Sequence, residues 1–147
     1  MNPKITSILL DVGQIISLIV IIIDGVVIPN NVLSLVLFIL AVALIFYSVW
    51  AMRMNRFYQV PDIKKQKTSV TNGPYTYIRN PMYTSQLLLT LSIIINKYSA
   101  ANLVIFLFLF WIFIQKMDYE ERLLKTHFGL QFKEYVSKTK KLIPYIY

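Results

Sequence analysis

The sequence lacks the residues on which several kinds of functional site depend. Among 147 residues there is no cysteine, one histidine and only four glycines. Without cysteine, the chain can form no disulfide, no thiolate metal site and no cysteine nucleophile. His127 has no second ligand residue at metal-binding spacing, so we expect a surface or packing role and no metal site. The glycines form no G-x-G-x-x-G turn, which argues against a Rossmann-type cofactor domain.

Acidic residues are also scarce, whereas apolar residues are abundant. The chain has seven Asp and Glu residues and fifteen Lys and Arg residues, and hydrophobic residues make up 56% of it. A soluble domain of this size could not bury so much apolar surface, so lipid must cover the rest. No linker composition and no internal repeat divides the sequence. We therefore expect one membrane domain that spans residues 1–147.

Apolar runs predict about four transmembrane helices. A bilayer core about 30 Å thick needs roughly 20 apolar residues per helix, and runs at 5–28 and 32–52 meet this length. Shorter runs at 82–96 and 101–116 are joined by a brief polar turn and predict a short helical hairpin. Helices this short must extend into flanking residues, thin the bilayer or lie partly in the interface. The expected fold is an all-α integral membrane bundle.

The distribution of positive charge predicts the orientation of this bundle. Basic residues gather in the loop at 53–81 and again in the segment at 117–147, whereas the connection between the first two runs has none. Both segments, and both termini, are therefore expected to be cytoplasmic. Topology and attraction to anionic headgroups explain the net charge of +8, so we expect no nucleic-acid partner. Abundant Ile, Lys and Asn are typical of an AT-rich microbial genome, which favours a plasma membrane.

A polar cluster stands directly before the third apolar run. Gly73 and Pro74 predict a turn, Asn80 fits a helix N-cap, and Pro81 fits the first helical position, where its missing N–H has no consequence. In that arrangement Arg79 and the first amides of the helix face the cytoplasmic interface, where they could hold a carboxylate. A membrane-entry turn anchored among headgroups explains the same residues equally well.

A mixed acidic and basic run follows the fourth apolar run and predicts a helix that continues through 117–124. Neighbouring residues on a helix point about 100° apart, so we expect only one of Glu120 and Glu121 to face a given pocket. A solvated helix face is the simpler interpretation of this run. Gly129 predicts a helix stop. A second, amphipathic cytoplasmic helix near 131–139 should lie on the membrane surface.

Two carboxylates, Asp11 and Asp24, lie within the first apolar run. Intramembrane carboxylates are often functional. Both are within about two turns of an expected helix end, so solvation at the interface explains them better than a proton path.

The motifs resemble those of a known family. The segment from Gly73 to Tyr83 resembles the G-x-Y-x-x-x-R-H-P-x-Y motif of isoprenylcysteine carboxyl methyltransferases and related phospholipid methyltransferases. The E-E-x-x-L run at 120–124, Phe-Gly at 128–129 and the later aromatic pair and Ile-Pro resemble that family's C-terminal series. The resemblance covers about residues 70–145. Asn80 replaces the family's histidine, and it can exchange hydrogen bonds but cannot titrate.

The resemblance implies a membrane enzyme that uses S-adenosylmethionine and methylates a lipid-like or prenylated acceptor entering from the bilayer. It implies a cofactor site built from helix ends and loops, with the residues Tyr75, Arg79, Asn80, Tyr83, Glu120 and Glu121. The expected catalytic residues are Arg79 and the two glutamates, because a carboxylate acceptor needs positioning whereas an amine acceptor needs a base.

Other readings of the sequence remain open. A non-catalytic scaffold or a lipid-binding protein derived from this family would share the basic loop and the apolar runs. Four spans without an inverted repeat or a chain of buried charges disfavour a transporter. The acceptor itself could be a prenylated cysteine, a phospholipid amine or another apolar acid or amine, and the oligomeric state is open.

Overall fold

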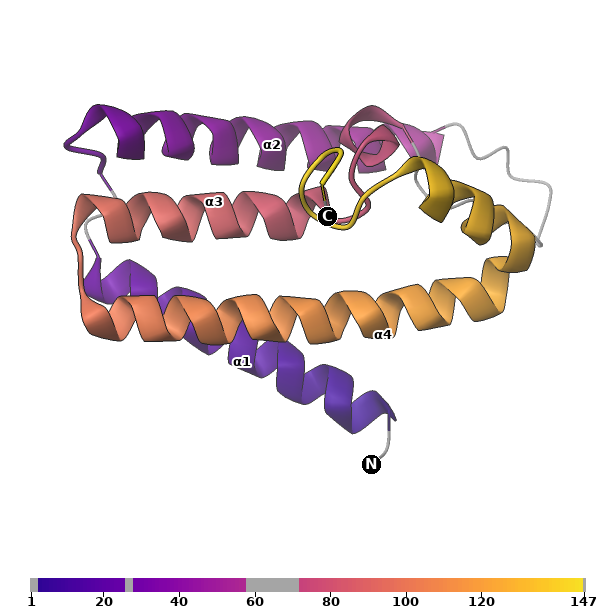
Figure 1. Cartoon of the computed structure of the whole chain (residues 1–147), viewed down its shortest axis with the longest axis horizontal. Helices are drawn as coiled ribbons and strands as arrows, with labels where there is room; N and C mark the ends of the chain where they lie inside the picture. Colours follow the sequence, from indigo (N-terminus) through magenta and orange to yellow (C-terminus); the bar gives the residue numbers. More distant parts are fainter. Residues whose placement is uncertain (1–2, 26–27, 58–71, 147) are drawn as a thin grey trace.

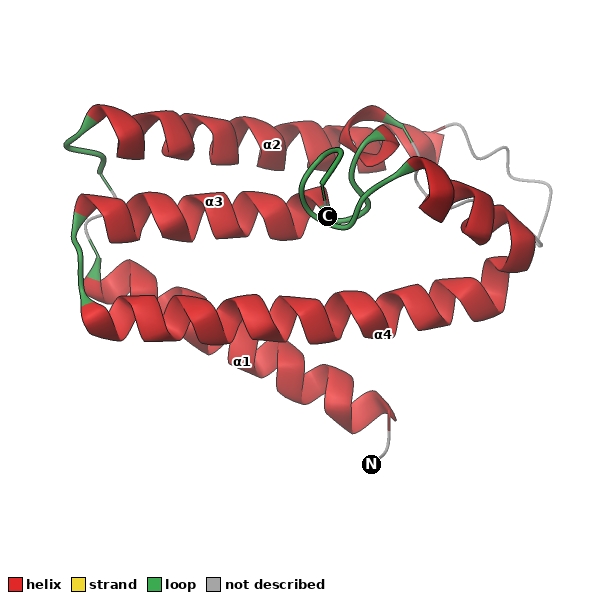
Figure 2. Cartoon of the chain, in the orientation of Figure 1, coloured by secondary structure: helices red, strands yellow, loops and turns green. Residues whose placement is uncertain are grey.

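The computed structural model describes residues 3–25, 28–57 and 72–146. Over these ranges the elements are α1 (Pro3–Asp24), α2 (Val32–Phe57), the 3₁₀ helix η1 (Gly73–Thr76), α3 (Pro81–Asn96) and α4 (Ala100–Lys138). The described residues form no strand, and their one extended pairing is an isolated parallel bridge between Ile78 and Lys140. The all-α class is therefore confirmed (Figure 2).

The long helices form an elongated bundle. In Figure 1, α2, α3 and α4 run side by side, and α1 crosses α4 at an angle. One face of α4 supplies the core through Leu109, Ile112, Phe113 and Met117, whose spacing of three and four residues places them on one side of the helix. Side chains from α1 and α3 pack on this face. The helix α2 packs on α3, where the buried Ser92 Oγ donates to the Ser34 carbonyl at 2.7 Å.

Large apolar side chains cover the outside of the bundle. Ile23 is 79% exposed and Phe46 is 72% exposed, and many neighbours on α1 and α2 are similarly open. Within the described residues, Val32–Arg53 and Ala100–Thr126 are long and apolar enough to cross a membrane. An outward apolar surface of this extent is stable in lipid and not in water, so the chain is membrane-associated.

The predicted short hairpin is short in one arm only. The helix α3 has 16 residues, as expected, whereas α4 has 39, because the fourth run continues through the helix predicted at 117–124 and, beyond the Gly129 kink, into the helix predicted near 131–139. The apolar run of α4 ends near residue 116, yet Met, Glu, Arg, Leu and Lys follow, and all of these are strong helix formers. The helix therefore continues into polar sequence, which is one of the three outcomes expected for a short apolar run.

At one end of the bundle, the α3–α4 turn is tied to the connection between α1 and α2. The Asn96 amide donates to the Ile28 carbonyl at 2.7 Å, and Asn96 Oδ1 accepts from the Asn30 backbone N–H at 2.8 Å. These two connections therefore share one end, opposite to the polar segments discussed below (Figure 1).

The start of α3 agrees with the sequence interpretation in position but not in chemistry. Asn80 is the N-cap and Pro81 the first helical residue, as predicted. The Asn80 side chain makes no capping hydrogen bond; instead its amide donates to the Lys141 carbonyl at 3.2 Å. Its backbone carbonyl accepts from the amides of Tyr83 and Thr84. These two amides are thus paired within the helix and are not open to a carboxylate.

The predicted stop at Gly129 is a sharp kink. Gly129 has φ 53° and ψ −116°, and the helix resumes beyond it to Lys138. The segment after the kink folds back over the end of the bundle (Figure 1). Its Phe132 side chain faces the protein and is only 4% exposed, whereas Leu130, directly after the kink, is 80% exposed. Most of the predicted basic loop, including Lys64, Lys65 and Lys67, lies outside the described residues, as does the side chain of His127.

Candidate functional site

The C-terminal segment joins the loop that precedes α3. The Arg79 amide donates to the Lys140 carbonyl at 2.7 Å, and the Lys140 amide donates to the Tyr77 carbonyl at 3.0 Å. The Asn80 amide continues the pairing by donating to the Lys141 carbonyl at 3.2 Å. This short stretch of extended pairing brings the two sequence motifs together in space.

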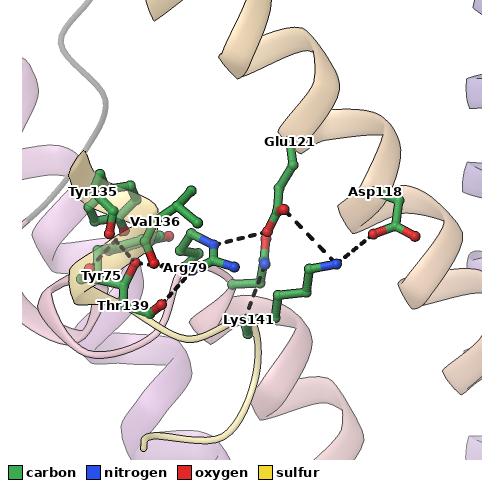
Figure 3. Close-up of polar contacts among 9 residues, drawn as sticks. Tyr75, Arg79, Asp118, Glu121, Tyr135, Val136, Thr139 and Lys141 are labelled. Atoms are coloured by element: carbon green, nitrogen blue, oxygen red, sulfur yellow. Dashed lines mark hydrogen bonds and ion pairs between the residues drawn. The ribbon is translucent and has the colours of Figure 1, made fainter. Parts of the chain in front are cut away.

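Arg79 lies at the centre of the junction (Figure 3). Its Nε donates to Glu121 Oε1 at 2.9 Å, and its Nη1 donates to the Thr139 carbonyl at 2.5 Å. The side chain is only 9% exposed. We expected Arg79 to face the interface, and instead two of its nitrogens bind inside the protein. Among the described residues, no hydrogen bond reaches its third nitrogen, Nη2.

Glu121 belongs to a row of alternating charges. Its Oε2 lies 4.0 Å from Lys141 Nζ, which also contacts Asp118 Oδ1 at 2.6 Å. Figure 3 shows this row running from Arg79 through Glu121 and Lys141 to Asp118. The side chain of Glu121 is 22% exposed, so its charge is partly desolvated and depends on both cations.

Glu120 contacts α3 instead. The Tyr83 hydroxyl donates to Glu120 Oε1 at 2.6 Å, and the Tyr83 ring stacks on Phe113 with centroids 4.9 Å apart. We expected only one of the two glutamates to face a given pocket, but Glu120 and Glu121 line the same cavity. Two long side chains about 100° apart can reach the two sides of one hollow, so the angular argument was too strict.

The shared cavity has a volume of about 150 Å³. We call it the glutamate cavity; it is lined by Tyr75, Arg79, Asn80, Glu120, Glu121, Leu124, Phe132 and Tyr135. Five of the six candidate site residues therefore meet in one place. The sixth, Tyr83, is not a lining residue and reaches the cavity only through its hydrogen bond to Glu120.

Three lining residues were not among the candidates. Leu124, Phe132 and Tyr135 belong to the C-terminal series that resembles the family, but they were interpreted as helix and membrane-surface positions and not as site residues. The Tyr135 hydroxyl donates to the Tyr75 carbonyl at 2.7 Å, which closes the cavity against the loop before α3. The apolar spacing of the C-terminal segment was a correct signal of burial, but it could not reveal that the partner is this loop rather than lipid.

The electrostatics of the glutamate cavity favour a ligand with positive charge. Glu120 and Glu121 outnumber the single cation Arg79. Burial raises the pKa of Tyr135 to about 12, although nearby Arg79 acts in the opposite direction. Burial, followed by repulsion from Glu120, also raises the pKa of Tyr75. Both phenols are therefore protonated at neutral pH and act as hydrogen-bond donors rather than bases.

A second cavity of about 430 Å³ adjoins the first and shares Glu121 and Phe132 as walls. Its lining is mostly charged and comes from both sides of the Gly129 kink: Asp118, Glu121, Arg122, Lys125, Phe132, Lys133 and Val136. Binding sites for small molecules usually enclose roughly 300–1,000 Å³. The glutamate cavity alone is below that range, but the two neighbouring cavities together fall within it.

The phospholipid methyltransferase family model matches residues 29–131. The chain belongs to this family. The match confirms the family resemblance and includes all six candidate residues. It begins after α1 and ends before Phe132, so α1 lies outside it, as do residues 132–141, which cover the cavity and which we call the C-terminal cover. A comparison with curated proteins finds no match. Family membership supports a membrane methyltransferase.

Proposed function

We propose that this chain is an integral membrane methyltransferase that moves a methyl group from S-adenosylmethionine to a lipid-like acceptor at the cytoplasmic face. The observation that carries the proposal is the glutamate cavity. It gathers the polar residues of two distant motifs at one end of an apolar bundle, inside a chain of the phospholipid methyltransferase family.

The arrangement of helix ends supports four membrane passes. The α1–α2 connection and the α3–α4 turn share one end of the bundle, and the glutamate cavity lies at the other. With 16 residues, α3 is about 24 Å long, less than the roughly 30 Å bilayer core. The start of α3, and the cavity beside it, would therefore lie at the cytoplasmic boundary of the hydrocarbon core, just below the headgroups, where an acceptor in the bilayer can reach it. There the basic residues of the C-terminal segment would face the cytoplasm.

The residues of the two cavities fit this cofactor. When bound, S-adenosylmethionine supplies an electrophilic methyl group on a positively charged sulfur. The excess of carboxylates in the glutamate cavity suits a ligand with net positive charge. Tyr75 also lines this cavity. The full cofactor would need both cavities, because about 150 Å³ can hold only part of it.

Each polar residue then has a role that its contacts support. Glu120 and Glu121 would hold the cofactor's ammonium group or ribose hydroxyls, and Arg79 would offer Nη2 to its carboxylate while fixing Glu121. Asn80 would hold the C-terminal cover in place, which requires a hydrogen-bond donor and no titration.

The carboxylates serve better at the ammonium end than beside the sulfur. A carboxylate against the sulfonium would stabilise the ground state, whose positive charge disperses as the methyl group moves. Apolar walls such as Leu124 and Phe132 suit the reacting atoms, because a dry surface that aligns them favours an in-line displacement.

The acceptor would reach the site from the bilayer. The description of the family favours a phospholipid acceptor, and a prenylated or other apolar carboxylate is the second possibility. A carboxylate acceptor needs only to be positioned. An amine acceptor needs a base. Glu120, which already accepts a hydrogen bond from Tyr83, would then take that role, and Glu121 alone would hold the cofactor's ammonium group.

Calorimetry with S-adenosylhomocysteine tests the proposal on detergent-purified protein. We expect saturable binding by the wild type and strong weakening by Glu120→Gln and by Glu121→Gln, which keep side-chain size and remove charge. Glu134→Gln is the matched control, because Glu134 is a surface residue paired only with Lys138 one turn away. The absence of wild-type binding at about millimolar ligand would refute the enzyme proposal.

A methyl-transfer assay identifies the acceptor. Wild-type protein with labelled S-adenosylmethionine and a membrane lipid extract should produce a labelled lipid, and Glu120→Gln should not. Cofactor binding without any labelled product would instead favour a degenerate family member. Neither binding nor transfer would favour the scaffold or lipid-binding alternative.

A further inference from the structure

Polar side chains of α1 meet α4 and α3 inside the bundle. Lys116 Nζ donates to Asp11 Oδ1 and to Gln14 Oε1, each at 2.6 Å. The Gln14 amide in turn donates to Gln86 Oε1 on α3 at 2.8 Å. The Lys116 side chain is only 12% exposed, and the family match does not include α1. A helix outside the matched region thus holds a cation inside the bundle.

This cation lies against a residue that reaches the glutamate cavity. Lys116 Nζ lies over the Tyr83 ring, 5.4 Å from its centroid. The ring also stacks on Phe113, and its hydroxyl donates to Glu120. An ammonium within about 6 Å of a ring face is attracted to it, so Lys116 helps to fix the orientation of that ring.

We propose that Lys116, held by Asp11 and Gln14 of α1, is a positioning residue. It acts through Tyr83 to keep the Glu120 carboxylate at the wall of the glutamate cavity. The inference rests on the proposed function, and it gives α1 a part in the site. If the pair instead served only to neutralise a buried charge, its loss would lower stability without a specific effect on the cavity.

A double-mutant cycle distinguishes these two roles. S-adenosylhomocysteine affinity is measured for wild type, Lys116→Met, Tyr83→Phe and the double variant. If Lys116 acts through Tyr83, each single change should raise Kd by at least about threefold. The Kd of the double variant should then be no higher than the higher of the two single-variant values. Lys116→Arg keeps the charge and should restore affinity. Should Lys116→Met fail to fold, Asp11→Asn replaces it in the cycle.

The chain contains a matched control. The other carboxylate of α1, Asp24, pairs with Lys97 at 3.7 Å near the opposite end of the helix, where both side chains are about half exposed. Lys97→Met should therefore leave cofactor affinity unchanged. Multiplicative losses in the double variant, or a lower melting temperature for Lys116→Met without any change in Kd, would overturn the inference and leave the proposed function intact. A wild type that binds no cofactor would refute both.

Discussion

Arg79 contacts the chain on both sides of the Gly129 kink at the same time. Its hydrogen bonds reach Glu121 on one side and the carbonyls of Val136 and Thr139 on the other. A buried guanidinium is stable only when such partners compensate for its lost hydration. In this structure, therefore, Arg79 is first a structural link and only through Nη2 a candidate ligand.

Replacing Arg79 should therefore destabilise the protein as well as the site. Arg79→Ala leaves Glu121 with only the more distant Lys141 as a cation and releases the Thr139 carbonyl. We expect a loss of about 2–4 kcal/mol, somewhat less than for a fully buried pair because Glu121 is partly exposed. Thermal unfolding in detergent measures this loss. Lys138→Ala, which breaks the exposed Lys138–Glu134 pair within α4, should leave the melting temperature nearly unchanged. An unaltered melting temperature for Arg79→Ala would contradict the structural role.

At this scale the sequence identified the residues but not their partners. The motifs indicated Arg79 and both glutamates as ligands of a cofactor. Arg79 and Glu121 are 42 residues apart and bind each other. No periodicity within one helix carries that information, because it depends on how the loop before α3 and the C-terminal segment cross in space.

Among the elements, α4 owes its shape to Gly129. The residue has φ 53°, a conformation that side chains with a Cβ rarely adopt. A Cβ at this position would meet no atom within 4 Å. Any penalty for a larger residue there is therefore one of backbone conformation, not of crowding.

Gly129→Ala should strain or straighten the kink. We expect about 2–3 kcal/mol of destabilisation, because φ 53° with ψ −116° lies outside the left-handed helical region and is sparsely populated by residues with a Cβ. We also expect weaker cofactor binding, because Phe132 and Tyr135 lie beyond the kink and line the cavity. Thermal unfolding and calorimetry measure the two effects. Thr126→Ala, an exposed position nearby on the same helix, serves as the control. If Gly129→Ala bound cofactor as tightly as the wild type, the kink would not be what places the cover.

The sequence predicted the helices and the break at Gly129. Each apolar run became a helix, because hydropathy reports where apolar surface must be covered. Hydropathy does not report where a helix ends, but the helix formers at 117–124 and Gly129 do, and α4 continues past its apolar run to a kink at that glycine, as predicted. Gly129 predicted a break in the helix, but the direction of the segment after the break depends on packing against the loop before α3.

In the whole molecule, the α1–α2 connection and the α3–α4 turn lie at one end of the bundle, and the glutamate cavity lies at the other. This arrangement predicts which residues share a side of the membrane. The absence of native cysteine allows single labels to be introduced cleanly. With a membrane-impermeant maleimide on intact cells, Asn30→Cys and Tyr98→Cys should react, because both positions are exposed at the end of the bundle that the proposed topology places outside the cell. Ser137→Cys should react only after the membrane is opened. Labelling of Asn30→Cys and Tyr98→Cys from opposite sides would contradict the four-pass arrangement.

The pairing between the loop before α3 and the C-terminal segment also imposes an order on biosynthesis. A chain translated only as far as Leu130 would already contain all four apolar runs and could enter the membrane. It would still lack Phe132, Tyr135 and the carbonyls that bind Arg79. Contacts between segments about 60 residues apart form late in folding. Residues 132–139 must therefore be synthesised before the glutamate cavity can exist, so a chain cut short at Leu130 would enter the bilayer without the site of the proposed function.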